Sequence, residues 1–126
     1  MAFSGRGAIY LILETIKNKL KEIDPSVDYG TVDNSRMESA WNYIVFDRKI
    51  MRTNTNKTGY SYYFSVHVIR ENFIPEGLEI KIIEKMEEIA GMRFAGNDIQ
   101  YTYTNKPNTN MVIEMASIDF VRPVKA

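Results

Sequence analysis

An alternating run of side chains between Tyr60 and Asn72 constrains the fold more than any other stretch of this sequence. One set of alternate residues is aromatic or branched, and it consists of Tyr60, Tyr62, Phe64, Val66 and Val68. The set between them is more polar, and it consists of Ser61, Tyr63, Ser65, His67 and Ile69. Successive side chains of a strand point to opposite faces of a sheet, so the run predicts one long strand. Its more polar face is expected to be partly exposed or covered by another subunit.

Four other segments have the composition of strands, and they are residues 27–30, 41–47, 94–104 and 111–121. Residues 41–47 are predicted to pair antiparallel with the alternating strand. The basic and polar residues 48–59 between these two strands predict a long, mobile loop. Residues 106–110 are expected to join the last two strands as a hairpin loop. Pro123 is expected to end the strand pattern.

Two segments carry apolar residues at helical spacing. In residues 7–23 the apolar side chains recur in steps of three and four, and Asp24-Pro25 follows as a stop signal. The second helix is predicted to open at Pro75-Glu76-Gly77 and to end at Gly91, a typical C-terminal cap residue. The element order is therefore α-β-β-β-α-β-β. It predicts a single α+β domain over residues 1–126, in which both helices cover one face of a mainly antiparallel sheet of four to five strands.

Composition excludes several classes of protein. The chain has 16 basic and 16 acidic residues, and this balance argues against a general nucleic-acid binder. It contains no Cys, which rules out disulfides and thiolate metal sites. No apolar run approaches the roughly 18 residues that a membrane span needs.

The residues needed for catalysis are scarce. His67 is the single histidine, so a Ser–His–acid triad could form only through it. A packed or half-exposed strand histidine is the simpler interpretation. Gly5-Arg6-Gly7 has the form GxG, but no strand precedes it, as a dinucleotide-binding loop requires. We therefore predict no enzyme activity and no catalytic, cofactor-binding or metal-binding residue.

Charge is distributed unevenly along the chain. Every charged residue from 48 to 70 is basic, whereas residues 76–88 hold five acids and two lysines. Three interpretations are open: solvated surface, head-to-tail contact between identical subunits that closes a ring, or contact with the DNA backbone. The candidate interaction surface comprises Arg48, Lys49, Met51, Arg52, Lys57, Arg70, Glu84, Glu87 and Glu88.

The whole layout resembles the tail terminator (tail completion, or tail-to-head joining) proteins of long-tailed, siphovirus-like phages and prophages. The segments that carry the resemblance are IYLILETIKNKLKEI, VDYG, NYIVF, YSYYFSVHVI, PEGLEIKIIEKMEEI and DIQYTYT…MVIEMASIDF. They cover nearly the full chain in order, but they are patterns and contain no catalytic signature. Related neck and head-closure proteins are similar in size.

The resemblance implies a structural virion protein without catalytic chemistry. Such proteins form a ring, usually a homohexamer, that caps the tail tube, ends its polymerisation and joins it to the DNA-filled head. The implied partners are further copies of the chain, the tail tube protein, a head-completion or neck protein, and DNA that passes through the lumen without sequence recognition. No membrane is implied, and the expected location is the virion tail or neck, after assembly in the host bacterial cytoplasm. The alternatives are a head–tail connector or neck protein and, from another class, a small oligomeric ligand-binding module or enzyme.

Overall fold

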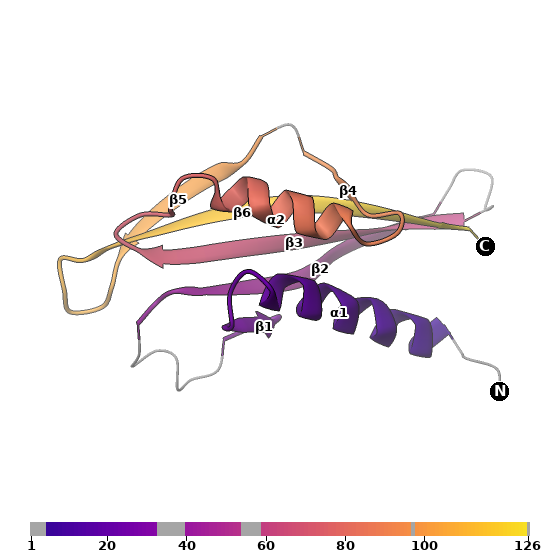
Figure 1. Cartoon of the computed structure of the whole chain (residues 1–126), viewed down its shortest axis with the longest axis horizontal. Coiled ribbons are helices and arrows are strands. Elements are labelled where there is room, and N and C mark those ends of the chain that lie inside the picture. Colours follow the sequence, from indigo (N-terminus) through magenta and orange to yellow (C-terminus); the bar gives the residue numbers. More distant parts are fainter. Residues whose placement is uncertain (1–4, 33–39, 54–58, 97, 126) are drawn as a thin grey trace.

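Two helices and six strands lie within residues 5–32, 40–53, 59–96 and 98–125, which the computed structural model describes. The elements are α1 (Gly5–Lys21), β1 (Val27–Tyr29), β2 (Tyr43–Thr53), β3 (Gly59–Glu71), α2 (Leu78–Glu87), β4 (Arg93–Phe94), β5 (Gln100–Asn105) and β6 (Val112–Lys125). The predicted α+β class and element order are confirmed (Figure 1). The sheet has six strands where four to five were expected.

The sheet is built on three long strands, β2, β3 and β6, of which β3 lies in the middle. The strand order is β1-β2-β3-β6-β4, and β5 also pairs with β6. Only β1 is parallel to its neighbour among the described strands, and the other pairs are antiparallel. The register sets His67 of β3 opposite Val45 of β2 and Ser117 of β6, which places these side chains on one face.

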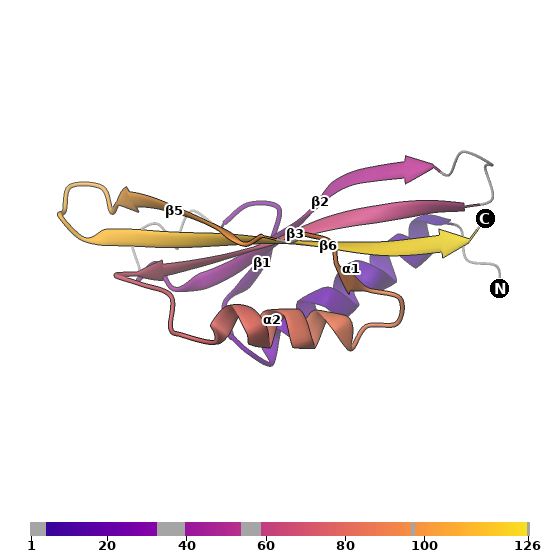
Figure 2. The same cartoon turned by 90° about the horizontal axis from the view of Figure 1, so that it is seen from above.

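Both helices lie on one face of the sheet, as predicted, and the other face has no helix over it (Figure 2). The main core fills the space between the helices and the sheet. Its fully buried large side chains include Ile16 and Leu20 of α1, Ile82 and Met86 of α2, and Phe46, Phe64 and Phe120 of the sheet. The spacing of Ile16 and Leu20, and of Ile82 and Met86, is one helical turn, so each helix directs one apolar stripe at the sheet.

The face away from the helices carries a second, smaller apolar cluster. Four buried residues form it, namely Tyr43, Val45, Ile69 and Ile113. Val32, Trp41 and Met115 are partly buried against them. We call this side of the sheet the open face, because helices cover only the opposite side (Figure 2).

The predicted loop over residues 48–59 is wrong for its first half. β2 continues to Thr53, and its residues 50–53 pair with residues 60–63 of β3. A register shift between Arg48 and Ile50 leaves Lys49 as an extra residue, which is the geometry of a β-bulge. All side chains from Arg48 to Thr53 are exposed, so the segment lacks the alternation that marks a half-buried strand. Backbone pairing with β3 defines the strand here, and residues 54–58 lie outside the described residues.

Two other predicted boundaries differ from the structure. The expected strand at 94–104 is divided into β4 and β5, which pair with successive parts of β6. β6 also runs through Pro123 to Lys125, although Pro123 was expected to end it. At Pro123, β6 pairs with β3 and has passed its last pair with β4, at Val121. Proline is tolerated at such an edge because its missing N–H removes no ladder hydrogen bond there.

The helix ends also differ slightly from the prediction. α1 ends at Lys21, two residues before the expected end. α2 begins after Gly77, which has a φ of 89° that favours glycine, and it ends at Glu87. Gly91, the predicted cap, has a φ of 80° and lies in the turn that follows the helix.

Candidate functional site

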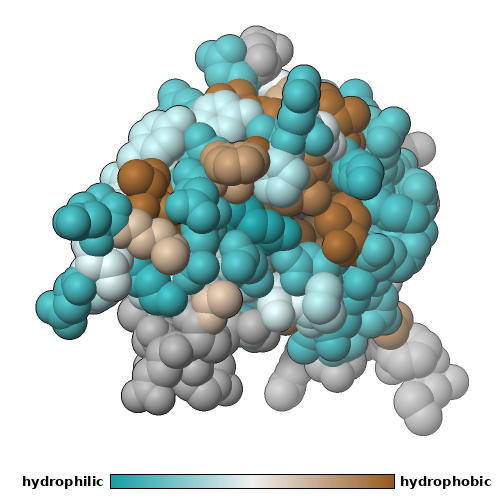
Figure 3. Space-filling view, turned by 60° about the vertical axis from the view of Figure 1, so that its left-hand side comes forward, coloured by the Kyte–Doolittle hydropathy of each residue, from teal (hydrophilic) through white to brown (hydrophobic). Residues whose placement is uncertain are grey.

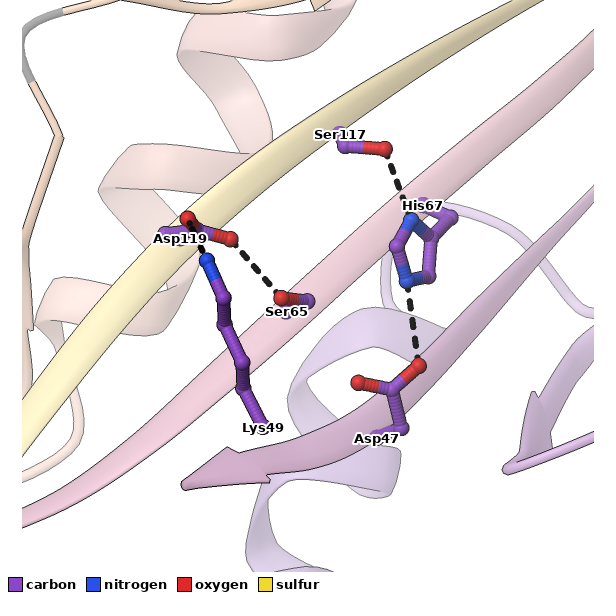
Figure 4. Close-up of polar contacts among 6 residues, drawn as sticks. All are labelled: Asp47, Lys49, Ser65, His67, Ser117 and Asp119. Carbon is purple, nitrogen blue, oxygen red and sulfur yellow. Dashed lines mark hydrogen bonds and ion pairs between the residues drawn. The ribbon is translucent and has the colours of Figure 1, made fainter. Parts of the chain in front are cut away.

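A chain of three polar side chains crosses the open face from strand to strand (Figure 4). Ser117 Oγ of β6 lies 2.8 Å from His67 Nδ1 of β3, and His67 Nε2 lies 3.0 Å from Asp47 Oδ2 of β2. The histidine side chain is 26% exposed. An ionised carboxylate can only accept, so Nε2–H donates to Asp47, and in the neutral ring Nδ1 accepts from the Ser117 hydroxyl. The half-buried strand histidine of the sequence prediction thus has both ring nitrogens bonded.

A second polar group lies beside the first on the same face (Figure 4). Lys49 Nζ donates to Asp119 Oδ2 at 2.8 Å, and Ser65 Oγ donates to Asp119 Oδ1 at 2.7 Å. Burial would raise the pKa of Asp119, but the hydrogen bonds from Lys49 and Ser65 outweigh burial and lower this pKa. The charged Asp119 therefore links β2, β3 and β6 through their side chains.

An open cavity of about 360 Å³ adjoins the His67 chain. Its lining comprises Gly30, Thr31, Val32, Tyr43, Val45, Asp47, His67, Ile69, Met115 and Ser117. The walls are thus mainly apolar, with the Ser117–His67–Asp47 chain along one side. A cavity of this composition suits a small, largely apolar group.

The Ser117–His67–Asp47 chain has the order of a nucleophile, a base and an orienting carboxylate. A hydrolytic triad also needs donors aimed at the developing oxyanion. Ser117 lies inside the sheet, opposite His67 on one side and Gln100 of β5 on the other. Backbone N–H groups along these strands are used in the sheet ladders, so they do not converge on a reacting oxygen. The chain therefore ties three strands together and lacks the surroundings of an acyl-transfer site.

Two different hairpins form opposite ends of the sheet, and the β5–β6 hairpin extends well past the helices (Figure 2). The first is the end of β2 and β3, where Ile50 is 42% and Met51 53% exposed. The second is the β5–β6 hairpin, where Tyr103 is 64% exposed, and the nearby Phe73 is 67% exposed. Figure 3 shows apolar side chains at the surface on this second side, between polar ones. Exposed aromatic and long apolar side chains at projecting tips are features of contact surfaces.

The predicted basic residues of β2 fall at the first of these ends. Arg48 Nε donates to the Tyr29 hydroxyl at 3.1 Å, and the Arg52 guanidinium lies 5.5 Å from the centre of the Tyr63 ring. Lys49 is paired with Asp119, and Met51 is exposed nearby. The structure thus brings Arg48, Lys49, Met51 and Arg52 onto one hairpin. Lys57 lies outside the described residues.

Arg70 is placed far from that group and serves the fold. Its Nη2 lies 2.6 Å from Asp24 Oδ2, and the two side chains are only 14% and 8% exposed. Arg70 also donates to the Ile69 carbonyl oxygen at 2.9 Å. A buried side chain with these bonds is poorly placed to meet another protein.

The acidic residues of α2 largely interact within the subunit. Glu88 pairs with Lys19 of α1 at 2.8 Å, and Lys85 pairs with Glu22 at 2.8 Å. The hydrogen bond to Glu22 raises the pKa of Lys85, and the bond from Lys19 lowers the pKa of Glu88. These pairs join the two helices across their outer surface.

The remaining two predicted acids lie on either side of this network. Glu87 Oε2 accepts from the Phe94 N–H at 3.2 Å, and Glu84 lines the groove between the helices. Glu84, Glu87 and Glu88 therefore do not join the basic hairpin within one subunit.

Sequence patterns pointed to His67 but missed the polar residues around it on the open face. Asp47, Ser117 and Asp119 were not selected, although each lies in a predicted strand. Their signal was the alternation Ser117-Ile118-Asp119 in β6, which matches Ser65-Val66-His67 in β3. Two strands with polar residues at every second position can align them only in the right register, and register is not visible in one sequence.

No model of a known protein family matches the chain, and no curated protein is significantly similar to it in sequence. Neither of the two helices in the described residues is long and apolar enough to cross a membrane. The described residues also contain no group of three or more His, Asp or Glu side chains that could hold a metal ion.

Proposed function

We propose that this protein is the subunit of a phage tail terminator, which forms a ring on the end of the tail tube. The ring would end tube polymerisation and provide the surface that joins the DNA-filled head. The observation that carries the proposal is the pair of different hairpins at opposite ends of the sheet, each with exposed apolar side chains. Different surfaces at opposite ends favour head-to-tail contacts, and such contacts close into a ring when the rotation between copies permits.

The central strands support a structural role. Three long strands are tied laterally by Ser117–His67–Asp47 and by Lys49–Asp119–Ser65. Side-chain links of this kind stiffen a sheet against shear between strands. A rigid sheet with two different ends suits a subunit that must hold its neighbours at a fixed angle. A head–tail connector or neck protein would use the same properties, and it remains the nearest alternative.

A small ligand-binding module or enzyme is the second candidate, because the cavity beside His67 has apolar walls and three linked polar groups. A fluorophosphonate probe, which reacts with activated serine nucleophiles, tests whether the protein is a serine hydrolase. Labelling of Ser117 that is lost in both Ser117→Ala and His67→Ala would support a hydrolase. We expect the wild type to be labelled no more than Ser117→Ala, whereas Ser65→Ala, which keeps Ser117 and His67, should behave as wild type in either case.

The tail terminator is tested by deleting the gene in the phage or prophage that encodes it and examining the particles by electron microscopy. Tube polymerisation without its terminator should give tails of variable, excessive length that are not joined to filled heads. The purified wild-type protein should form rings and should restore tails of uniform length when it is added to the mutant extract. Normal joined virions in the deletion strain would overturn the proposal. Tails of normal length that fail to join heads would favour the neck protein instead.

A further inference from the structure

Charge is separated along the length of the sheet. Residues 48–53, 93–94 and 119–124 extend from the middle of the sheet to one end, and they hold five basic residues, with Asp119 as the one acid. Residues 71–79 and 101–114 lie at the opposite end and hold four glutamates, with Lys106 as the one base. Figure 1 shows the two sets in opposite halves of the molecule along its long axis.

We call the first set the basic end and define it by Arg48, Ile50, Met51, Arg52, Arg93 and Arg122. Arg48, Arg52 and Arg93 are exposed, and so are the apolar side chains of Ile50 and Met51. Arg52 already lies against the Tyr63 ring, which shows that this guanidinium is positioned for contact with aromatic faces. The acids close to this set have partners in their own subunit: Asp119 is bound to Lys49 and Ser65, Glu87 accepts from the Phe94 N–H, and Glu88 is paired with Lys19.

We call the second set the aromatic end and define it by Phe73, Glu76, Glu79, Tyr101, Tyr103 and Val112. Phe73, Tyr101, Tyr103 and Val112 are all exposed. The Tyr101 hydroxyl donates to Glu79, and this bond raises the pKa of Tyr101 to about 12. The Tyr103 hydroxyl donates to Glu114 Oε2 at 2.8 Å. Carboxylates thus hold two tyrosine rings in place beside the exposed Phe73 and Glu76.

The two ends cannot neutralise each other within one subunit. Ser61, opposite Arg52, and Glu71, opposite Ile113, are ten residues apart on the same strand. At about 3.3 Å per residue the separation is about 33 Å. The Debye length in physiological salt is about 8 Å, so opposite charges at this distance are screened from each other. Contact between two molecules removes this separation.

We propose that the basic end of one copy binds the aromatic end of the next, and that this contact builds the ring of the proposed function, on which the inference rests. Arginine is suited to both features of the aromatic end, because it pairs with carboxylates and stacks on aromatic rings. The exposed apolar side chains at both ends supply area that excludes water from these contacts. The acidic surface that receives the basic end is therefore the aromatic end of the sheet. It replaces the predicted residues Glu84, Glu87 and Glu88, two of which have partners in their own subunit.

A second copy explains both ends, whereas DNA would explain only the basic one. The four glutamates at the aromatic end repel phosphate, so a DNA contact would leave this end and its exposed aromatic rings without a partner. The contact is heterologous, because two unlike surfaces meet, and repetition leads to a ring when it closes.

Charge reversal at each end provides the test. Arg48→Glu, Arg52→Glu and Arg93→Glu together make both ends acidic, and Glu76→Lys with Glu79→Lys makes both ends basic. Each variant alone should associate at least about tenfold more weakly than wild type, as loss of close interfacial charge pairs does. An equal mixture of the two should restore rings of even subunit number, because every contact in an alternating ring again joins opposite charges. Native mass spectrometry and negative-stain microscopy measure both effects.

Control charge reversals lie on the outer side of α1. Glu14→Lys and Lys21→Glu alter exposed residues away from both ends, and these variants should form rings as wild type does. Circular dichroism checks that all variants are folded. Wild-type-like rings from both end variants would overturn this inference and leave the ring of the proposed function intact. A wild-type protein that forms no ring would overturn both the end-to-end contact and the proposed function. If the arginine variant loses DNA binding but still self-associates, the basic end binds nucleic acid and the inference is wrong.

Discussion

Arg70 of β3 and Asp24, which follows α1, form a largely buried ion pair with 2.6 Å between Nη2 and Oδ2. Asp24 Oδ1 also accepts from the Ser26 N–H at 2.9 Å, so its two oxygens are used in different directions. Arg70 in turn donates to the carbonyl oxygens of Ile69 and Tyr43. The pair fixes the chain between α1 and β1 against the middle of the sheet.

Removing one partner of this pair should be costly. Arg70→Ala leaves the Asp24 carboxylate buried without its cation, and we expect a loss of about 3 kcal/mol in the free energy of unfolding. Urea denaturation followed by circular dichroism measures the loss. Arg48→Ala is the matched control, since it removes an exposed arginine and should cost less than about 1 kcal/mol. Equal, small losses in both variants would show that the Arg70 pair contributes little to stability.

Because of Asp119, the free energy of unfolding should depend on pH in the acidic range. Its pKa is lower in the folded protein than the ordinary value of 3.8, because the bonds from Lys49 and Ser65 outweigh the effect of burial. The charged carboxylate therefore stabilises the fold above pH 3.8, and this contribution is lost as the pH falls from there through the lowered folded pKa. Asp119→Asn should be less stable than wild type at pH 7, and the difference should shrink below about pH 4. Thermal melting of wild type and Asp119→Asn between pH 7 and about pH 3 measures this difference, and Asp98→Asn is the exposed control. A difference in stability that stays constant with pH would contradict the link to the Asp119 pKa.

Sequence patterns predicted most of the fold because its main signals are periodic. Ile16 and Leu20 show the helical period, and the residues around Val66 show the strand period. Residues 48–53 were missed because both faces of that strand are exposed, which removes the alternation on which the prediction depends. Its pairing with β3 is a tertiary effect, as is the continuation of β6 past Pro123.

Sequence patterns predicted the candidate site less well, because charged residues that are neighbours in the sequence are often far apart in the folded protein. Arg70 and Arg48 belong to one basic stretch of sequence, yet β3 turns back and places Arg70 in a buried ion pair. Glu88, just after α2, meets Lys19 of α1, which is 69 residues earlier, and Lys85 of α2 meets Glu22, which is 63 residues earlier. Conversely, Arg93 and Arg122 join Arg52 at one end through sheet pairing alone.

The main core depends on the buried stripe of α1. Ile16 is fully buried in the main core, whereas Leu11 on the same helix is 58% exposed. Ile16→Ala should lower the free energy of unfolding by about 3 kcal/mol through lost burial and a cavity. Leu11→Ala should cost less than about 1 kcal/mol, and chemical denaturation of the two variants compares them directly. Ile16→Asp should fail to fold, because it places a charge in this apolar site.

The extension of β2 past Arg48 can be measured in solution. Register pairs Arg52 with Ser61 and Thr53 with Tyr60, and Lys49 is the bulged residue. We expect cross-strand nuclear Overhauser effects between these pairs in the NMR spectrum, because antiparallel partners bring backbone protons close together. The pair Phe46 and Val66, in the centre of the sheet, is the internal standard for intensity. If cross-strand effects appear for Phe46 and Val66 but are missing beyond Arg48, residues 48–53 are not paired in solution. The basic end would then lack the fixed hairpin on which its contact with the aromatic end of a second copy depends.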